Sequence, residues 1–162
     1  MITQEIVKSL FDYSTETGDL IRKTSFNRWK SGQAIGFKNT SGYLEAGVNK
    51  KTYQVSHLVW CYFNGPVPIG REIDHINGKK LDNRIENLRV ADRAMNNQNK
   101  RISRNDSALK VLGVSWHKAS KSFVAQISKS GVKFHLGCFK SIDEASEAYI
   151  QAKRNLHQGC TI

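Results

Sequence analysis

The stretch REIDHINGKKLDNRIENLRVADRAMNNQNK, residues 71–100, decides the fold of this chain. Asp74 and His75 are adjacent at the end of a short run bounded by apolar residues. Asn77-Gly78, directly after them, is among the strongest short-range turn signals. The first half of the stretch therefore predicts a strand that ends in a pair of chemically active side chains.

The second half of the stretch predicts a second strand and a helix. Residues 87–90 follow a polar loop as an extended piece, and Asp92 has the side chain to cap a helix. If the hairpin packs on that helix, Asp74 and His75 face the helix side that carries Asn96. Two oxygen ligands and an imidazole then converge. Hydrolysis of a phosphodiester needs such a set, because a hard cation neutralises the phosphate and a base deprotonates water.

The pattern resembles the HNH family, also called the ββα-metal nucleases. The resemblance implies that Asp74 and Asn96 hold Mg²⁺ or Mn²⁺, since these ions prefer oxygen ligands. It implies that His75, with an ordinary pKa of about 6.5, is the general base. Asn87, the middle letter of the motif, would brace the loop by hydrogen bonds instead of reacting.

The last letter of the motif is Asn96, where many family members have His. This variant is common in the phage and intron-encoded branch of the family, so the resemblance is to phage-type homing endonucleases. Asn97 and Asn99 lie close to Asn96 and stay open as alternative ligands.

The composition favours a polyanionic partner. The chain has 162 residues, with 25 Lys and Arg against 14 Asp and Glu, which gives a formal net charge of +11. Such an excess of positive charge attracts nucleic acid, and we expect double-stranded DNA. A membrane is not expected, because no apolar run approaches the roughly 18 residues that span a bilayer and no signal peptide is visible. Three scattered cysteines without a CxxC motif predict reduced thiols in the cytoplasm.

The N-terminal segment, residues 1–54, reads as a small sheet-and-helix module. Thr3 can cap its helix, and a hairpin is expected between residues 43 and 55. Residues 22–38 are basic with aromatic residues between the charges. This segment either lies on phosphates or is ordinary structure in which Trp29 and Phe37 are core.

The second segment, residues 55–100, is expected to be the nuclease. It opens with a helix that Asn64-Gly65-Pro66 stops. Phage HNH proteins often have a His-Arg pair where this helix starts, but the pair here is Ser56-His57. We therefore expect His57 to pack or to form hydrogen bonds, and not to react.

A basic linker, residues 101–112, leads to a third module at residues 113–159. Alternation predicts a strand with Val114 and Trp116 on its apolar side, a second strand at 123–128 and a third at 133–136. Ser141 and Glu144 form a capping box for a final helix.

This third module resembles the plant ethylene-response-factor (Apetala-two) DNA-binding domain through the motifs GVSW, FVAQI, HLGCF and EASEAYIQAKRNLH. In that family the sheet enters the major groove, where alternate side chains reach base edges. The resemblance implies that the base readers are Ser115, His117, Gln126, Ser128, Lys133 and His135. Phosphate contacts are expected from Lys118, Lys121, Lys129, Arg84, Arg89, Lys100, Arg101 and Arg104.

The sequence thus predicts an α+β chain of three small pieces: a sheet-and-helix module, a ββα-metal nuclease core, and a three-stranded antiparallel sheet packed on one helix. The predicted function is a metal-dependent DNA endonuclease, a free-standing phage homing enzyme in the cytoplasm of the host cell. A monomer or weak dimer is expected, and one site per chain predicts nicking unless the protein pairs. A DNA-binding regulator that no longer cuts is the alternative, and an RNA-binding protein is a third, weaker one.

Overall fold

The computed structural model describes residues 2–25, 27, 29–100, 109–157 and 159–161. The chain forms two compact units, Met1–Arg93 and Ala94–Ile162, each described by itself below. The elements are helices and small antiparallel sheets, so the predicted α+β class is confirmed. The division into segments at residues 54, 100 and 112 stays a prediction. None of the helices in the described ranges has the length and apolar character needed to cross a bilayer.

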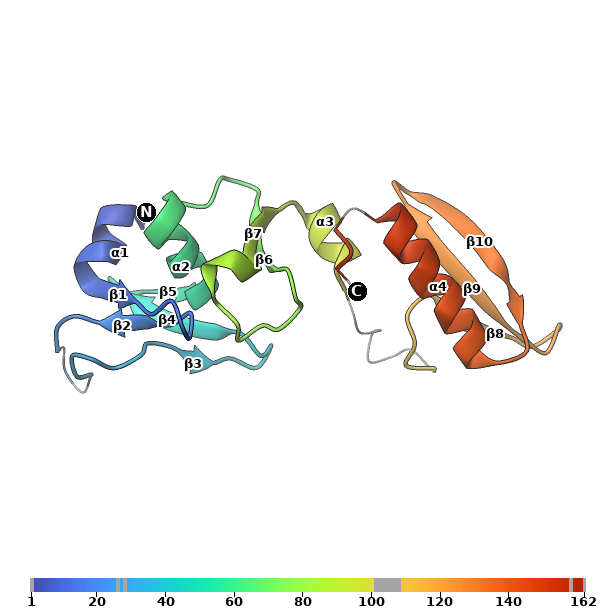
Figure 1. The fold of residues 1–162 in the computed structure, drawn as a ribbon, viewed down its shortest axis with the longest axis horizontal. Helices are drawn as coiled ribbons and strands as arrows, with labels where there is room; N and C mark the ends of the chain where they lie inside the picture. Colours follow the sequence, from blue (N-terminus) through green and yellow to red (C-terminus); the bar gives the residue numbers. More distant parts are fainter. Residues whose placement is uncertain (1, 26, 28, 101–108, 158, 162) are drawn as a thin grey trace. The chain divides into compact units, whose positions relative to one another are not determined.

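Two helices pack against each other in the first unit, above its small sheets in the view of Figure 1. Helix α1 (Gln4–Leu10) starts at Thr3, whose side chain accepts a hydrogen bond from the Ile6 amide at 3.4 Å, as the sequence predicts. Helix α2 (Val55–Asn64) ends at Gly65, which has a φ of 81°. The two helices contact each other and share one apolar core; its fully buried members include Val7, Leu20, Val55, Leu58, Val59 and Cys61.

Two small sheets surround these helices. One pairs β1 (Phe11–Tyr13) with β2 (Leu20–Arg22), and the other has the order β3 (Phe37–Lys38), β4 (Leu44–Val48), β5 (Lys51–Gln54). The predicted hairpin is β4–β5. Its turn residues Asn49 and Lys50 both have positive φ angles, 49° and 62°, which match the right-handed twist of the strands.

The predicted hairpin–helix follows in chain order. Strand β6 (Glu72–His75) pairs antiparallel with β7 (Leu88–Ala91), and a 3₁₀ turn, η1 (Ile85–Asn87), precedes β7. Ile73 and Leu88 belong to the core cluster of the first unit, so the hairpin is anchored by one apolar side chain on each strand. The sequence placed Asn87 in the strand, but this residue ends the 3₁₀ turn. Only Asp92 separates β7 from the helix α3 (Arg93–Gln98).

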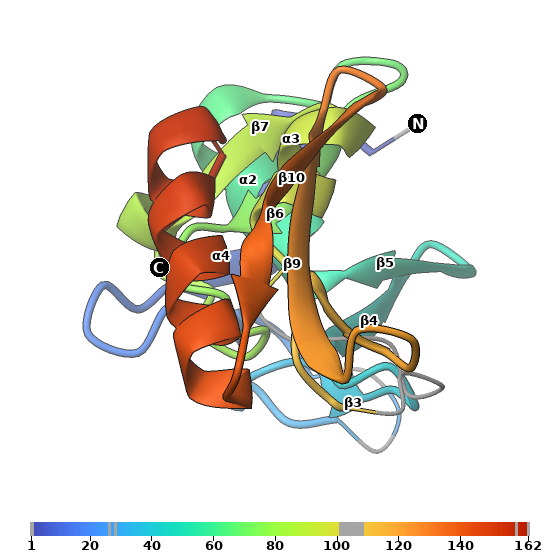
Figure 2. The ribbon, with the colours of Figure 1, turned by 90° about the vertical axis from the view of Figure 1, so that its right-hand side faces the viewer.

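The second unit contains the predicted sheet and helix. Strands β8 (Val114–His117), β9 (Ser122–Lys129) and β10 (Val132–Phe139) form an antiparallel sheet in the order β10-β9-β8. Helix α4 (Ile142–Leu156) lies across one face of this sheet (Figure 2). The Ser141 side chain caps α4 by accepting from the Glu144 amide at 3.2 Å, and Ala145 of α4 is buried in the core with Val114 and Ala125.

Two details of this sheet differ from the sequence interpretation. Trp116 lies on the same side of the sheet as Val114, as predicted, because it pairs with Phe123. It is nevertheless 45% exposed there, and it packs edge-on against Phe123 at 4.8 Å between ring centroids. β10 is also longer than residues 133–136, because an irregularity between His135 and Gly137 lets pairing continue to Phe139. Such an irregularity interrupts the alternation of apolar and polar side chains, so the alternation does not predict that the strand continues beyond it.

Candidate active site

Asp74 and His75 end strand β6 and are both buried, with 6% and 4% of their surface exposed. Arg89 stands directly opposite Asp74 on β7. The Nε and Nη2 atoms of Arg89 donate to Oδ2 of Asp74 at 3.0 and 2.8 Å. A buried carboxylate needs such a charged partner, because an unpaired ion loses its solvation without compensation. The ion pair therefore fixes the direction of the Asp74 side chain.

The ring of His75 is held by a residue in the loop after it. Nε2 of His75 lies 3.0 Å from Oδ1 of Asn83, and Asn83 is only 2% exposed. An amide oxygen can only accept a hydrogen bond, so with Oδ1 toward the ring it is Nε2 that carries the proton. Nδ1 is then the basic nitrogen of the neutral ring. This is the protonation pattern that a general base requires.

The loop between the strands is tied together by Asn87. Its Oδ1 accepts from the Asn77 amide at 2.9 Å, and its Nδ2 donates to the Asp82 carbonyl at 2.7 Å. The Asp82 carboxylate in turn accepts from Asn77 and from the Arg84 guanidinium, both at 2.7 Å. Hydrogen bonds from Arg84 hold the pKa of Asp82 well below its ordinary value. Asn87 thus joins the two ends of the loop, while its catalytic role stays a prediction.

The loop is also anchored to the N-terminal elements. The Ile85 amide donates to the Tyr13 hydroxyl at 2.9 Å. Gly18 has a φ of 79°, and a side chain there would meet the backbone nitrogen of Arg84 at 2.4 Å. The β1–β2 turn therefore supports the 3₁₀ turn that precedes β7, and only glycine permits this approach.

The third member of the predicted site, Asn96, lies on α3 in the second unit. Its position beside Asp74 and His75 stays a prediction. The donor set fits a hard divalent cation, since it combines a carboxylate oxygen with an amide oxygen. No group of three or more His, Cys, Asp or Glu side chains in the described ranges could hold a metal ion. The predicted metal site instead includes the side-chain amide of Asn96, which is not one of these four residue types.

The predicted base readers share one sheet face. The register pairs Ser128 with Lys133 and Gln126 with His135, and it puts Ser115 beside Val124 and His117 beside Ser122. Because side chains alternate along each strand, all six predicted readers lie opposite the face that carries Ala125 and packs on α4. Their contact with bases stays a prediction.

The predicted phosphate contacts have varied surroundings. Lys118 and Lys121 are exposed between β8 and β9, and Lys129 is exposed at the end of β9. Arg84 and Arg89 hold Asp82 and Asp74, as described above. Arg101 and Arg104 lie outside the described residues, and the carbonyl of Lys100 accepts a hydrogen bond from the Lys153 ammonium.

Comparison with known proteins identifies the family. Residues 53–98 match the family model described as HNH endonuclease. The chain is also 32% identical over 100 residues to Protein 3.8 of Escherichia phage T7, an alignment that covers 61% of this chain and 80% of that protein. The chain belongs to the HNH endonuclease family.

Two further proteins are similar to this chain. It is 31% identical over 90 residues to YosQ of Bacillus subtilis (strain 168), whose name describes a prophage-derived HNH homing endonuclease; the alignment covers 56% of this chain and about half, 51%, of YosQ. The second is a solved structure titled "DNA binding and cleavage by the HNH homing endonuclease I-HmuI". The alignment covers 94% of this chain and 92% of the chain in that structure. Its identity is 21% and its TM-score is 0.45.

The match to the HNH family model covers all four predicted motif residues, Asp74, His75, Asn87 and Asn96. It ends at residue 98, before the C-terminal sheet. The likeness of that sheet to the ethylene-response-factor domain therefore stays a proposal.

The sequence does not predict two neighbours of the HNH pair, Asn83 and Arg89. Asn83 carries no signal that separates it from the rest of the polar loop, and the sequence predicts Arg89 as a phosphate contact. The cross-strand register places Arg89 against Asp74, and no local sequence signal reports that register.

That His57 takes no part in the reaction stays a prediction. It lies on α2 and is partly buried. Burial lowers the pKa of its imidazole. The neutral form is therefore favoured in the folded protein.

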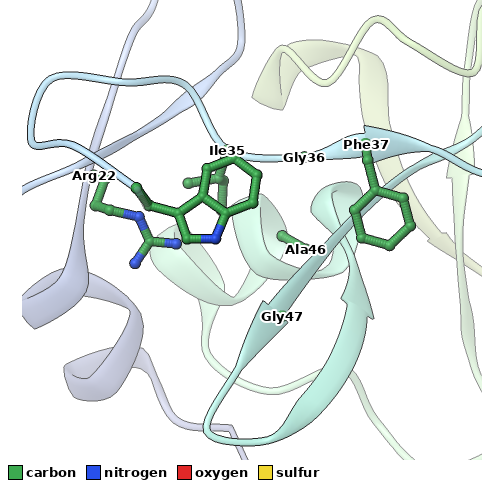
Figure 3. A pocket seen from close by; sticks show the side chains of 7 residues that line it. Arg22, Ile35, Gly36, Phe37, Ala46 and Gly47 are labelled. Carbon is green, nitrogen blue, oxygen red and sulfur yellow. The ribbon is translucent and has the colours of Figure 1, made fainter. Parts of the chain in front are cut away.

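The basic and aromatic segment of residues 22–38 forms part of a hollow of about 320 Å³ (Figure 3). Arg22, Trp29 and Phe37 line it, with Ile35 and Ala46 at its apolar floor. Trp29 and Phe37 are 39% and 54% exposed, so the interpretation of both as core is wrong. The contact of this segment with phosphates stays a prediction.

Proposed function

We propose that this protein is a metal-dependent DNA endonuclease that hydrolyses phosphodiester bonds as a free-standing phage homing enzyme. The observation that carries the proposal is the buried pair at the end of β6, in a chain of the HNH family. Asp74 is oriented by Arg89, and His75 is held with its proton on Nε2 by Asn83. A scaffold that only bound DNA would not need a metal-ligating carboxylate and a base in adjacent, separately oriented positions.

The chain's own residues supply the base and its support. Nδ1 of His75 would accept the proton of the water whose oxygen forms the new bond to phosphorus, while the bond to the leaving sugar oxygen breaks. Asn83 would keep the other ring nitrogen protonated, and Asn87 would keep the loop closed over the pair. Each of these roles depends on a hydrogen bond of 2.7 to 3.0 Å described above.

Asp74 and Asn96 would hold Mg²⁺ or Mn²⁺, and the family resemblance assigns them. When bound, such an ion neutralises phosphate charge and stabilises the leaving oxygen. Arg89 would act on the ligand itself, since its Nε and Nη2 atoms both donate to Oδ2 of Asp74.

The C-terminal sheet would place the duplex. Its exposed face carries polar and basic side chains at alternate positions, which suits base edges in the major groove. One site per chain predicts nicking by a monomer or weak dimer. Phage relatives suggest work in the cytoplasm of the host cell.

A DNA-binding regulator that does not cut is the second candidate, and the Arg89–Asp74 ion pair favours it. The guanidinium neutralises the carboxylate that would otherwise attract a cation. A regulator of this kind would keep the sheet and the basic surface and lose metal-dependent hydrolysis.

A cleavage assay separates the two candidates. The substrate is a pool of supercoiled plasmids with random inserts, incubated with Mg²⁺, with Mn²⁺ or with EDTA. An endonuclease converts a sequence-defined part of the pool to open circles with either metal and none with EDTA. Binding of the same plasmids without any open circles under all three conditions would establish the regulator instead.

A further inference from the structure

Helix α3 is too short to be stable alone. It has six residues, RAMNNQ, and none of them is buried. Isolated helices shorter than about 12 residues are marginal in water, and asparagine is a poor helix former. The helix that carries Asn96 must therefore be held by contacts from other elements.

The end of the chain supplies such contacts within the second unit. We call residues 159–161 the C-terminal clasp. The Gly159 amide donates to Oε1 of Gln98 at 3.1 Å, and the Thr161 hydroxyl donates to Oδ1 of Asn99 at 2.6 Å. Figure 1 shows the red C-terminal segment next to α3. The clasp thus binds the last turn of α3 at two side chains.

The fit between the clasp and α3 is close enough to exclude a side chain. A Cβ at Gly159 would lie 2.6 Å from the carbonyl oxygen of Met95 and 3.2 Å from Cβ of Gln98. The first of these is a backbone atom of α3, so it cannot turn away as the end of a side chain could. Only glycine at position 159 lets the clasp reach the helix.

A buried lysine adds a third tie. Lys153, in the last turn of α4, is 1% exposed, and its ammonium donates to the carbonyl of Lys100, two residues after α3. Burying an ammonium group costs free energy unless hydrogen bonds replace its water. The hydrogen bond to Lys100 is thus a buried tie between the last turn of α4 and the chain just after α3.

We propose that the C-terminal clasp and Lys153 position α3, and through it Asn96, so that the C-terminal unit forms part of the cutting machinery and not only of the DNA-reading surface. The contact to α3 stands on the geometry above, whereas its effect on cutting rests on the proposed function. Gly159, Thr161 and Lys153 are positioning residues, because they act on the reaction through α3.

The proposal predicts a link between seating DNA and cutting it. Helix α4 packs on the proposed reading sheet with its middle and holds the end of α3 with its last turn. DNA seated on the sheet and the helix that carries the metal ligand then belong to one compact unit. Loss of the clasp should loosen α3 while leaving the sheet, and hence DNA binding, unchanged.

Hydrogen exchange in the full-length protein tests the contact directly. The reporters are the amides of Asn99 and Lys100, which donate to Met95 and Asn97 carbonyls in the last turn of α3. In Gly159→Val both should exchange at least tenfold faster, while amides of β9 keep their rates. Gly47→Val is the matched control, because position 47 has open space within 4 Å. It should leave both reporters unchanged.

Two milder variants guard against a general loss of structure. Thr161→Val removes one hydroxyl donor and should raise exchange at Asn99 about fivefold. Lys153→Met should act on Lys100 more strongly than Lys140→Met, which removes an exposed charge from the same unit. In the two clasp variants and in Lys153→Met the rate of plasmid cutting should fall about tenfold, with the dissociation constant for DNA in EDTA within twofold of the parent.

Each result decides one part of the proposal. Unchanged exchange at Asn99 and Lys100 in Gly159→Val overturns the clasp, whatever happens to cutting. Faster exchange with an unchanged cutting rate overturns the link from the clasp to Asn96. A parent protein that never cuts, combined with faster exchange in Gly159→Val, supports the clasp and overturns the proposed function.

Discussion

His75 is held by a hydrogen bond that selects which ring nitrogen carries the proton. The acceptor, Oδ1 of Asn83, is buried, so water does not compete for the bond. Residues that orient a functional histidine in this way contribute to activity even though they touch no substrate. Asn83 is also an expensive residue to bury, since its Nδ2 has no hydrogen-bond partner in the described part of the chain. Substitution of Asn83 therefore tests whether its hydrogen bond to His75 contributes to activity.

Asn83→Ala should lower the rate of cutting about 10- to 100-fold and leave DNA binding unchanged, because the ring loses its fixed tautomer. Asn83→Asp is the control, since it keeps an acceptor of the same shape. Nitrogen-15 spectra of the His75 ring should show the proton on Nε2 in the parent and a mixture of tautomers in Asn83→Ala. Equal cutting rates for Asn83→Ala and the parent would contradict the role of Asn83.

The sequence predicts the active-site pair itself but not its supports. Asp74 and His75 are neighbours in the chain, and a turn signal follows them, so their place at a strand end is a local property. Arg89 meets Asp74 only because of the strand register, and Asn83 meets His75 only because of the loop path. Neither the Arg89–Asp74 contact nor the Asn83–His75 contact can be predicted from the local sequence.

Among the helices and strands, the β6–β7 hairpin depends most on α2. Ile73 and Leu88 pack in the core that Leu58 and Val59 of α2 help to form. His57 lies on the same helix, and burial lowers its pKa. Protonation of His57 should therefore weaken the packing that supports the hairpin.

The sign of the pH effect follows from this shift. The unfolded chain binds a proton at His57 near pH 6.5, whereas the folded chain binds it only at lower pH. Stability is thus fully present above about pH 6.5 and is lost as the pH falls toward the folded pKa. Urea unfolding of the parent and of His57→Gln at pH 7.5 and pH 5.5 measures the effect. The parent should lose more stability than the variant, and equal losses would contradict the prediction.

Local sequence signals predict the elements whose stabilising contacts come from residues nearby in the chain. Thr3 and Ser141 cap α1 and α4 as expected, and the β4–β5 hairpin lies where the turn residues put it. α3 is different, because its order depends on Gly159 and Thr161 about 60 residues later in the chain. The sequence therefore predicts that this helix exists but not what holds it.

For the molecule as a whole, the net charge of +11 is the property that should govern the proposed association with DNA. Neutralising phosphates releases counterions, so affinity falls with added salt. The dissociation constant for a 40-base-pair duplex should rise about 10²-fold or more between 50 and 200 mM salt. A mobility-shift titration measures it, and a flat response would show that the basic surface does not contact phosphates.

The most direct test of the nuclease site is the pair of rates for the parent and His75→Ala on a supercoiled plasmid that carries a cleaved insert. Removing the proposed base should lower the cutting rate by about 10² or more, because general base catalysis contributes about that factor. DNA binding in EDTA should stay nearly unchanged. If His75→Ala nicks the plasmid at the parent rate, His75 is not the base, and the account of the site is wrong.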